Sequence, residues 1–204
     1  MDTTRYVLGV ILVTFFPPAL LYWVTIHPFA RLWRKVGATT TYLLVIPAMA
    51  AACALLYLIR GWLLGADLGT NWFLAAPGLG IYVIAIVIGF QCRKHLSFRI
   101  LVGLPEVAKD SPPGKLLQEG IYAAVRHPRY LTIIFATLGM ALVINYLGAY
   151  VLTLLLNMLL YLIILLEERE LLGRLGEEYA DYQRRVPRLI PRFRRRPVES
   201  QWLE

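Results

Sequence analysis

The stretch AYVLTLLLNMLLYLIILL, residues 149–166, is an almost unbroken run of apolar side chains without a single charge. A helix needs about 20 predominantly apolar residues to cross a hydrocarbon core of about 30 Å, and this run nearly reaches that length. Four more apolar runs stand at about 6–26, 41–60, 74–92 and 130–146, and their apolar residues lie all round a helix rather than on one face. We therefore expect an all-α integral membrane bundle of about five transmembrane helices.

The composition also favours a lipid-embedded protein. Of its 204 residues, 58% are hydrophobic and 17% are charged, and the mean hydropathy is +0.60, which is too apolar for a soluble domain of this size. The net charge of +8 comes from arginines and lysines that gather between or after the apolar runs, as in loops that face anionic lipid head groups. We therefore predict membrane lipids as partners and no nucleic acid. Cys53 and Cys92 lie in apolar runs without metal-like spacing, and no metal site is predicted.

The distribution of basic residues predicts an orientation. The first connection carries Arg31, Arg34 and Lys35, residues 93–129 hold seven more basic residues, and an arginine-rich tail follows the last run. The other connections have balanced charge or none. The positive-inside rule then places the N-terminus outside and the C-terminus in the cytoplasm, which requires an odd number of spans.

Two segments are predicted to lie outside the spans. Residues 93–129 are interrupted by prolines and glycine, which predicts a cytoplasmic connection with turns. After Leu166 the chain becomes charged, but a helical pattern of leucines continues towards Pro187, which predicts an amphipathic helix along the cytoplasmic interface. We divide the chain into a three-span region, 1–92, a core of loop, two-span hairpin and C-terminal helix, 93–191, and a basic tail, 192–204.

Residues able to carry chemistry concentrate at one end of the last two expected spans. Proline favours the first position of a helix, so His127-Pro128 marks the start of the fourth span, where free backbone N–H groups attract anionic ligand groups. A very short connection makes the last two spans an antiparallel hairpin, which brings Tyr130 and Glu167 to nearly the same depth. One polar cluster at the bilayer edge can thus be formed by Arg126, His127, Tyr130, Glu167 and Glu168.

Charges at a helix end can simply mark the water interface. Here two adjacent carboxylates, Glu167 and Glu168, directly follow an apolar run, where burial is costly without a cationic partner. A positively charged sulfonium would suit such a carboxylate, and the aromatic faces of Tyr122 and Tyr130 would also favour it. These features favour a ligand site over an interface marker.

Five spaced motifs follow one another in the last part of the chain: Gly120-Ile121-Tyr122, Arg126-His127-Pro128-Arg129-Tyr130, Glu167-Glu168, Gly176-Glu177-Glu178-Tyr179-Ala180-Asp181-Tyr182 and Val186-Pro187-Arg188-Leu189-Ile190-Pro191. In this order they resemble the isoprenylcysteine carboxyl methyltransferase family and, more distantly, the membrane phospholipid methyltransferases. The resemblance implies an S-adenosylmethionine-dependent methyltransferase that acts on a lipid-like or lipidated acceptor through a carboxylate, an amine or a thiol.

The resemblance also implies where the cofactor binds. It would be lined by residues of the loop, the start of the fourth span and the end of the fifth: Leu116, Leu117, Tyr122, His127, Pro128, Arg129, Tyr130 and Glu167, to which the polar cluster adds Arg126 and Glu168. Glu167 would meet the amino-acid end of the cofactor, Tyr122 or Tyr130 would pack near its adenosine or sulfonium, and residues 176–182 would close the pocket.

The sequence departs from the family at Ile163, one helical turn before Glu167. Prenylcysteine-methylating members carry at that place an arginine that faces the acceptor carboxylate. We therefore expect another acceptor, unless Arg126 or Arg129 takes over that role. An amine acceptor would need a group that removes a proton, for which His127 and Glu168 are the candidates.

Two other functions stay open at this stage. A membrane sterol-type reductase that uses NADPH would have a similar C-terminal helical architecture, although no convincing basic, aromatic pocket for that cofactor is present in the sequence. A non-enzymatic membrane scaffold would not need the motifs that cluster at one face, and no charges line a path through the bilayer.

Overall fold

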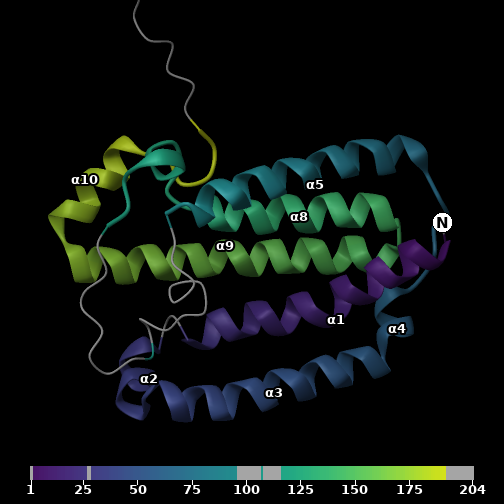
Figure 1. Ribbon diagram of the computed structural model, residues 1–204, viewed down its shortest axis with the longest axis horizontal. Helices are drawn as coiled ribbons and strands as arrows, with labels where there is room; N and C mark the ends of the chain where they lie inside the picture. The colour runs from purple at the N-terminus through teal and green to yellow at the C-terminus, as the bar shows by residue number, and fades with distance from the viewer. Residues whose placement is uncertain (1, 27–28, 96–106, 108–115, 192–204) are drawn as a thin grey trace, which may run out of the picture.

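The computed structural model describes residues 2–26, 29–95, 107 and 116–191, and within them the chain forms helices joined by turns and irregular segments, with one isolated bridge between Asp67 and Tyr146 (Figure 1). The basic tail, 192–204, and much of the connection expected at 93–129 lie outside the described residues. The elements in chain order are α1 (Asp2–Ile26), α2 (Ala30–Val36), α3 (Ala38–Leu58), α4 (Arg60–Leu64), α5 (Trp72–Arg93), the 3-10 turn η1 (Gly120–Ala123), α8 (Pro128–Ile144), α9 (Leu147–Leu175) and α10 (Glu177–Arg185).

Four of these helices are long and apolar enough to cross a membrane: Thr3–Ile26 of α1, Ala38–Leu58, Trp72–Arg93 and Leu147–Leu175. The fourth expected span, α8, is apolar but has 17 residues. At 1.5 Å per residue it covers about 26 Å, slightly less than a hydrocarbon core of about 30 Å. The all-helical membrane architecture is confirmed, with four full-length candidate spans and one shorter apolar helix.

The ends of α8 follow from local sequence. Pro128 occupies its first turn, where a missing N–H costs nothing. Asn145 ends the helix in the left-handed conformation with φ 51°, and α9 begins two residues later. Asparagine adopts this conformation more readily than most residues. The resulting tight connection folds α8 and α9 into the antiparallel hairpin expected from the sequence (Figure 1).

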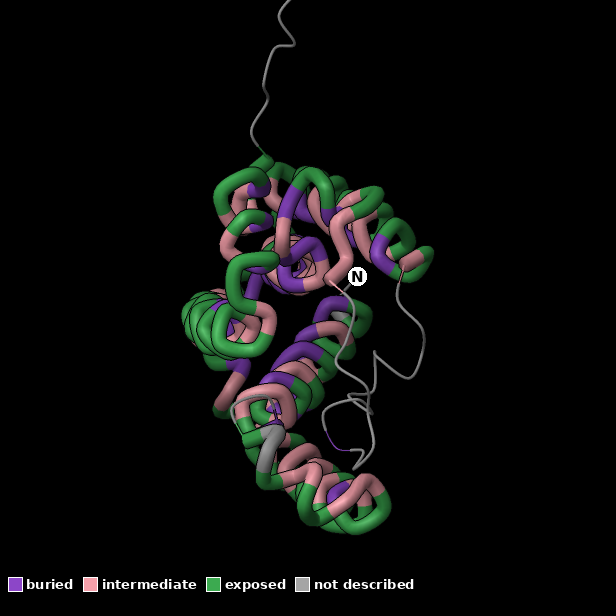
Figure 2. The backbone as a smooth tube through the Cα atoms, turned by 90° about the vertical axis from the view of Figure 1, so that its left-hand side faces the viewer, coloured by how far each residue is buried: buried purple, intermediate pink, exposed green. Residues whose placement is uncertain are grey.

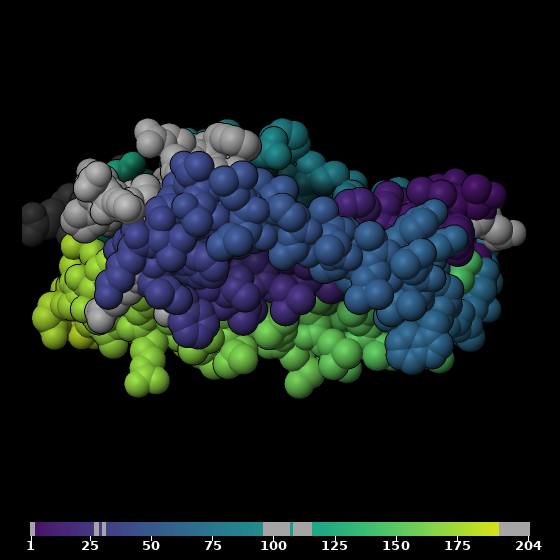
Figure 3. All heavy atoms as spheres, turned by 90° about the horizontal axis from the view of Figure 1, so that it is seen from below, coloured from purple at the N-terminus to yellow at the C-terminus, as the bar shows by residue number. Residues whose placement is uncertain are grey.

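The long helices lie side by side in the order α5, α8, α9, α1 and α3, with α3 at the periphery (Figures 1 and 2). The pair α5 and α8 has the most extensive contact, because Gly78 faces Gly139 so closely that a Cβ on Gly78 would stand 2.9 Å from the Gly139 carbonyl oxygen. In the most apolar 18-residue stretch of α3, only 6% of the residues are buried inside the protein. Figure 3 shows α3 and α2 covering one face of the bundle.

At the end of the bundle where the chain begins, polar interactions join α1, the connection between α4 and α5, and the connection between α8 and α9. The Arg5 side chain is 1% exposed, forms an ion pair with Asp67, and donates from Nε to the Ile144 carbonyl oxygen at 2.9 Å. Asn145 donates from its side chain to the Gly69 carbonyl oxygen at 2.9 Å. A buried arginine is tolerated here because its guanidinium is paired and hydrogen-bonded.

The expected C-terminal helix differs from the structure. We predicted one amphipathic helix beginning after Leu166, but α9 continues without a break to Leu175, and a separate helix, α10, follows. The break lies at Gly176, whose φ of 57° is a conformation that glycine adopts at little cost. The change in polarity after Leu166 therefore marks a change of surroundings within one helix rather than a new element.

Candidate functional site

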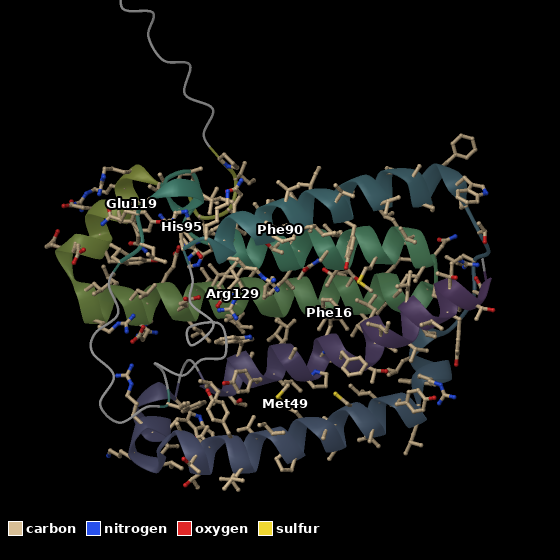
Figure 4. All side chains as sticks on the ribbon, in the orientation of Figure 1. Phe16, Met49, Phe90, His95, Glu119 and Arg129 are labelled. Atoms are coloured by element: carbon tan, nitrogen blue, oxygen red, sulfur yellow. The ribbon has the colours of Figure 1, made fainter. Side chains whose placement is uncertain are left out.

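The candidate site lies at the end of the bundle remote from the N-terminus (Figures 1 and 4). It is built from the start of α8, the last turns of α9, η1, α10 and the segment that follows α10. The hairpin brings the first residues of α8 beside the charged part of α9, as the sequence predicted, because both lie towards the end of the hairpin remote from the connection.

Glu168 is the centre of this site and is only 5% exposed. Its Oε1 accepts a hydrogen bond from Nε of Arg126 at 2.9 Å and lies 3.0 Å from Nε2 of His127. Its Oε2 accepts from Nε and Nη2 of Arg188 at 3.0 and 2.6 Å. We call these four residues the Glu168 cluster. Both carboxylate oxygens are thus engaged by protein groups.

The backbone ties the same segments together. The N–H groups of Arg126 and His127 donate to the carbonyl oxygens of Pro187 and Arg188 at 2.9 and 3.1 Å. The Arg126 side chain also donates, at 2.8 and 2.9 Å, to the carbonyl oxygens of Gln183 and Val186. The segment after α10 is therefore held against the start of α8 by its backbone as well as by charge.

The charges of the Glu168 cluster do not balance. Two guanidinium groups, of Arg126 and Arg188, face one carboxylate. The hydrogen bond with Glu168 raises the pKa of Arg188 above its ordinary value. One positive charge is therefore not balanced within the Glu168 cluster.

Glu167 differs from its neighbour. Its side chain is 24% exposed, yet its Oε2 is buried and has no hydrogen-bond partner among the residues that the structure describes. Nδ1 of His127 lies 3.9 Å from this oxygen, beyond hydrogen-bond distance. A buried carboxylate oxygen without a donor is costly, so Glu167 retains the capacity to bind a further group.

The hydrogen bonds of His127 assign different roles to its two ring nitrogens. The Glu168 carboxylate accepts from Arg126 and Arg188 and can only accept, so Nε2 of His127 must carry the hydrogen. In a neutral ring, Nδ1 then has a free lone pair on the side of Glu167. His127 can therefore take up a proton at Nδ1, with a carboxylate close by to stabilise the resulting cation.

Three tyrosines surround the Glu168 cluster. Tyr122, Tyr179 and Tyr182 are all buried, and the Tyr182 hydroxyl donates to the Tyr122 carbonyl oxygen at 2.7 Å. Burial raises the pKa of Tyr182 to about 12 and also raises those of Tyr122 and Tyr179. All three are neutral phenols near neutral pH, able to donate hydrogen bonds.

His95 approaches the site from the end of α5 and packs edge-on against Tyr122, with 6.2 Å between ring centroids. Gly120 makes this approach possible: its φ is 59°, and a Cβ there would stand 2.3 Å from Nε2 of His95. The sequence predicted Gly120 and Tyr122 as part of one motif but not His95. Nothing in the local pattern distinguished this histidine from an ordinary residue at a helix end.

The other predicted site residues are less uniformly placed. Leu116 packs with the buried tyrosines of α10, Leu117 is half-buried, and Pro128 is buried at the start of α8. The Tyr130 ring lies 5.6 Å from that of His127 and otherwise packs in the apolar core. Arg129 turns towards α1, with its guanidinium 4.2 Å from the centroid of the Trp23 ring (Figure 4).

Sequence reasoning missed Arg188 as a site residue, although it lies in the last motif. Besides binding Glu168, Arg188 donates from Nη1 to the Tyr161 hydroxyl at 2.9 Å. It comes 20 residues after Glu168 in the chain. Its contribution depends on the turn after α10, which no local pattern predicts.

These features define a class: a helical membrane protein with a charged, tyrosine-rich site at one end of its bundle. The family described as phospholipid methyltransferase matches residues 73–178, just over half of the chain. The chain belongs to this family of membrane methyltransferases, and the resemblance inferred from its motifs is confirmed. The matched region runs from α5 into the first turn of α10 and contains three members of the Glu168 cluster.

One curated relative is Methanethiol S-methyltransferase 1 of Bradyrhizobium diazoefficiens, which is 28% identical over 130 residues. The similarity covers 59% of this chain and 45% of the relative, so this chain accounts for less than half of that protein's length. No solved structure matches.

Proposed function

We propose that this protein is an S-adenosylmethionine-dependent membrane methyltransferase whose cofactor binds at Glu167, next to the Glu168 cluster. The observation that carries the proposal is the buried Oε2 of Glu167, which has no partner among the described residues. Membership of a methyltransferase family supports methyl transfer as the reaction. A cationic ligand would supply the missing partner.

The residues at this place fit the cofactor. S-adenosylmethionine supplies, when bound, a methyl group on a positively charged sulfur, and it also carries an ammonium group. The Glu167 carboxylate suits either cation, and the ring of Tyr130, which packs against the same histidine as Glu167, offers an aromatic face to a sulfonium. Charge and aromatic character therefore agree in favouring this ligand.

Within the proposal, His127 is the residue that moves a proton. It takes the proton of the acceptor S–H or N–H at Nδ1, since Nε2 is occupied by Glu168. Glu168, the other candidate base, has both oxygens engaged and serves as a positioning residue that fixes the tautomer of His127. Arg126 and Arg188 hold the segment after α10 over the site and so exclude water.

The acceptor is proposed to be a lipid-like thiol or amine rather than a carboxylate. Ile163 is 2% exposed and packs in an apolar core with Leu160 and Tyr130, so it presents no cation to an acceptor. Arg126 is committed to Glu168 and to backbone oxygens, and Arg129 lies over a tryptophan. The name of the curated relative, a methanethiol methyltransferase, supports a thiol.

The test is calorimetric titration of the detergent-purified protein with S-adenosylhomocysteine, the demethylated product. We expect saturable binding that Glu167→Gln weakens about tenfold or more, because a hydrogen bond to a charged group contributes roughly 1.5–3 kcal/mol. Glu170→Gln is the matched control, since Glu170 lies on the same helix, is 44% exposed and, within the described part of the chain, forms an ion pair only with Arg174 at the surface. Equal affinity in wild type and Glu167→Gln would refute the site.

NADPH is titrated in parallel. Binding of NADPH instead of S-adenosylhomocysteine would support the sterol-type reductase, and binding of neither would support a scaffold. Membership of a methyltransferase family argues against both alternatives.

We also propose that the N-terminus faces outside and that the site faces the cytoplasm, from the bias of basic residues. Cys53 and Cys92 are first replaced, and single cysteines are then placed at Trp72 and at Glu177. Both positions are well exposed: Trp72 is 65% exposed, and the side chain of Glu177 is 91% exposed. A membrane-impermeant maleimide should label position 72 in intact cells and position 177 only after lysis. The reverse pattern would contradict the orientation.

A further inference from the structure

Tyr179 has a buried hydroxyl that the described residues leave unpaired. The residue lies on α10 and is 1% exposed. Its hydroxyl oxygen is buried and has no hydrogen-bond partner among the residues that the structure describes. Buried polar side-chain groups are nearly always paired, so this hydroxyl requires an explanation.

Local packing does not supply one. Tyr182 lies on the same helix three residues later, is 2% exposed, and has its ring centroid 6.0 Å from that of Tyr179. Its hydroxyl donates to the Tyr122 carbonyl oxygen at 2.7 Å. Two equally buried tyrosines on one helix thus differ in that only Tyr182 has its hydroxyl paired within the described chain. A phenylalanine would fill the apolar surroundings of Tyr179 without this cost.

Tyr179 lies near the proposed ligand site. Burial raises the pKa of Tyr179, and the negative charges of Glu168 and Glu167 raise it further, so this phenol keeps its proton and can donate it in a hydrogen bond. Close to it, Oε2 of Glu167 is a buried acceptor, also unpaired among the described residues. One donor and one acceptor without partners among the described residues match an α-amino acid zwitterion, in which a carboxylate and an ammonium group are attached to the same carbon atom.

We propose that the Tyr179 hydroxyl donates to the carboxylate at the amino-acid end of the cofactor, while Glu167 accepts from its ammonium group. This inference rests on the proposed function and adds to it a binding residue beyond residues 73–178, the region matched to the family. Solvent does not reach the hydroxyl, so the ligand enters by a shift of α10. Gly176 is the hinge for this shift. Its φ is 57°, and none of the described residues has an atom within 4 Å of the position that a Cβ would take there.

The test compares Tyr179→Phe with Tyr182→Phe in the full-length, detergent-purified protein. Thermal unfolding is measured without ligand, and affinity is measured for S-adenosylhomocysteine and for 5′-methylthioadenosine, which lacks the amino-acid end. Tyr179→Phe should unfold at the wild-type temperature or slightly above it, because the hydroxyl it loses makes no hydrogen bond with the residues that the structure describes. Tyr182→Phe, the matched control, should unfold at a lower temperature because it loses the bond to Tyr122.

For Tyr179→Phe, affinity for S-adenosylhomocysteine should fall about tenfold to hundredfold, as for a hydrogen bond to a charged group, while affinity for 5′-methylthioadenosine stays at the wild-type value. Unchanged affinity for both ligands, or an equal fall for both, would overturn the role of Tyr179 and leave the cofactor site in place. Failure of the wild-type protein to bind S-adenosylhomocysteine would overturn the proposed function together with this inference.

Discussion

Replacing Glu168 by alanine would remove the anion that three basic side chains share. The carboxylate is 6% exposed, Arg126 is 9% exposed and Arg188 is 32% exposed, so at least one guanidinium would stay buried without a counter-charge. Removing one partner of a buried ion pair costs about 3–5 kcal/mol. We expect the lower end, about 3 kcal/mol, because Arg188 can turn to water.

The assay is reversible unfolding in mixed micelles, with Glu170→Ala as the control. Glu170 lies half a turn further along α9 and, among the described residues, forms an ion pair only with Arg174, which is exposed and 3.6 Å away, so its loss should cost about 0.5 kcal/mol or less. Trypsin should also cut faster after Arg188 in Glu168→Ala, because the segment after α10 loses its attachment. If both variants lost the same stability, the Glu168 cluster would not be what holds the C-terminal segment, and the reasoning would fail.

Two further predictions concern the fold. Gly78→Ala should lower the free energy of unfolding by about 1–3 kcal/mol, since the new Cβ would stand 2.7 Å from Cβ of Leu142. Gly80→Ala is the control: among the described residues no atom lies within 4 Å of its new Cβ, so it should be neutral or slightly stabilising in the same unfolding assay. The hydrogen bond from Arg5 lowers the pKa of Asp67 below its ordinary value of 3.8, so the stability from this pair is present above that value and is lost as the pH falls through the lowered pKa. Unfolding midpoints measured below pH 4 should therefore drop less steeply in Asp67→Asn than in wild type.

Much of the helical framework could be predicted from the apolar runs alone. The expected span at 74–92 is Trp72–Arg93 in the structure, and His127-Pro128 marked the start of α8 correctly. The end of α9 was wrong by nine residues, because residues 167–175 remain good helix formers after the apolar run stops. The polarity of the side chains indicates which solvent surrounds a helix. The end of the helix is indicated instead by a backbone feature, here the positive φ of Gly176.

The candidate site could be predicted only as a set of neighbours. The hairpin argument brought Arg126 and His127 to the last turns of α9, where the structure has them. It could not distinguish Glu167 from Glu168, because successive helical residues point about 100° apart and the surroundings of each depend on α10. The pairing of Arg5 with Asp67 could not be predicted either, since 62 residues separate the two along the chain.

The late position of Arg188 in the chain has a consequence for biosynthesis. A ribosome adds about 5–20 residues per second, so the 20 residues between Glu168 and Arg188 take about 1–4 s to synthesise after the carboxylate has been made. A chain that ended in this interval would contain Arg126, His127 and Glu168 but would lack the segment that covers the site. Such a truncated chain would leave one oxygen of the buried Glu168 carboxylate without the two hydrogen bonds from Arg188, so the complete cluster requires synthesis to continue past residue 188.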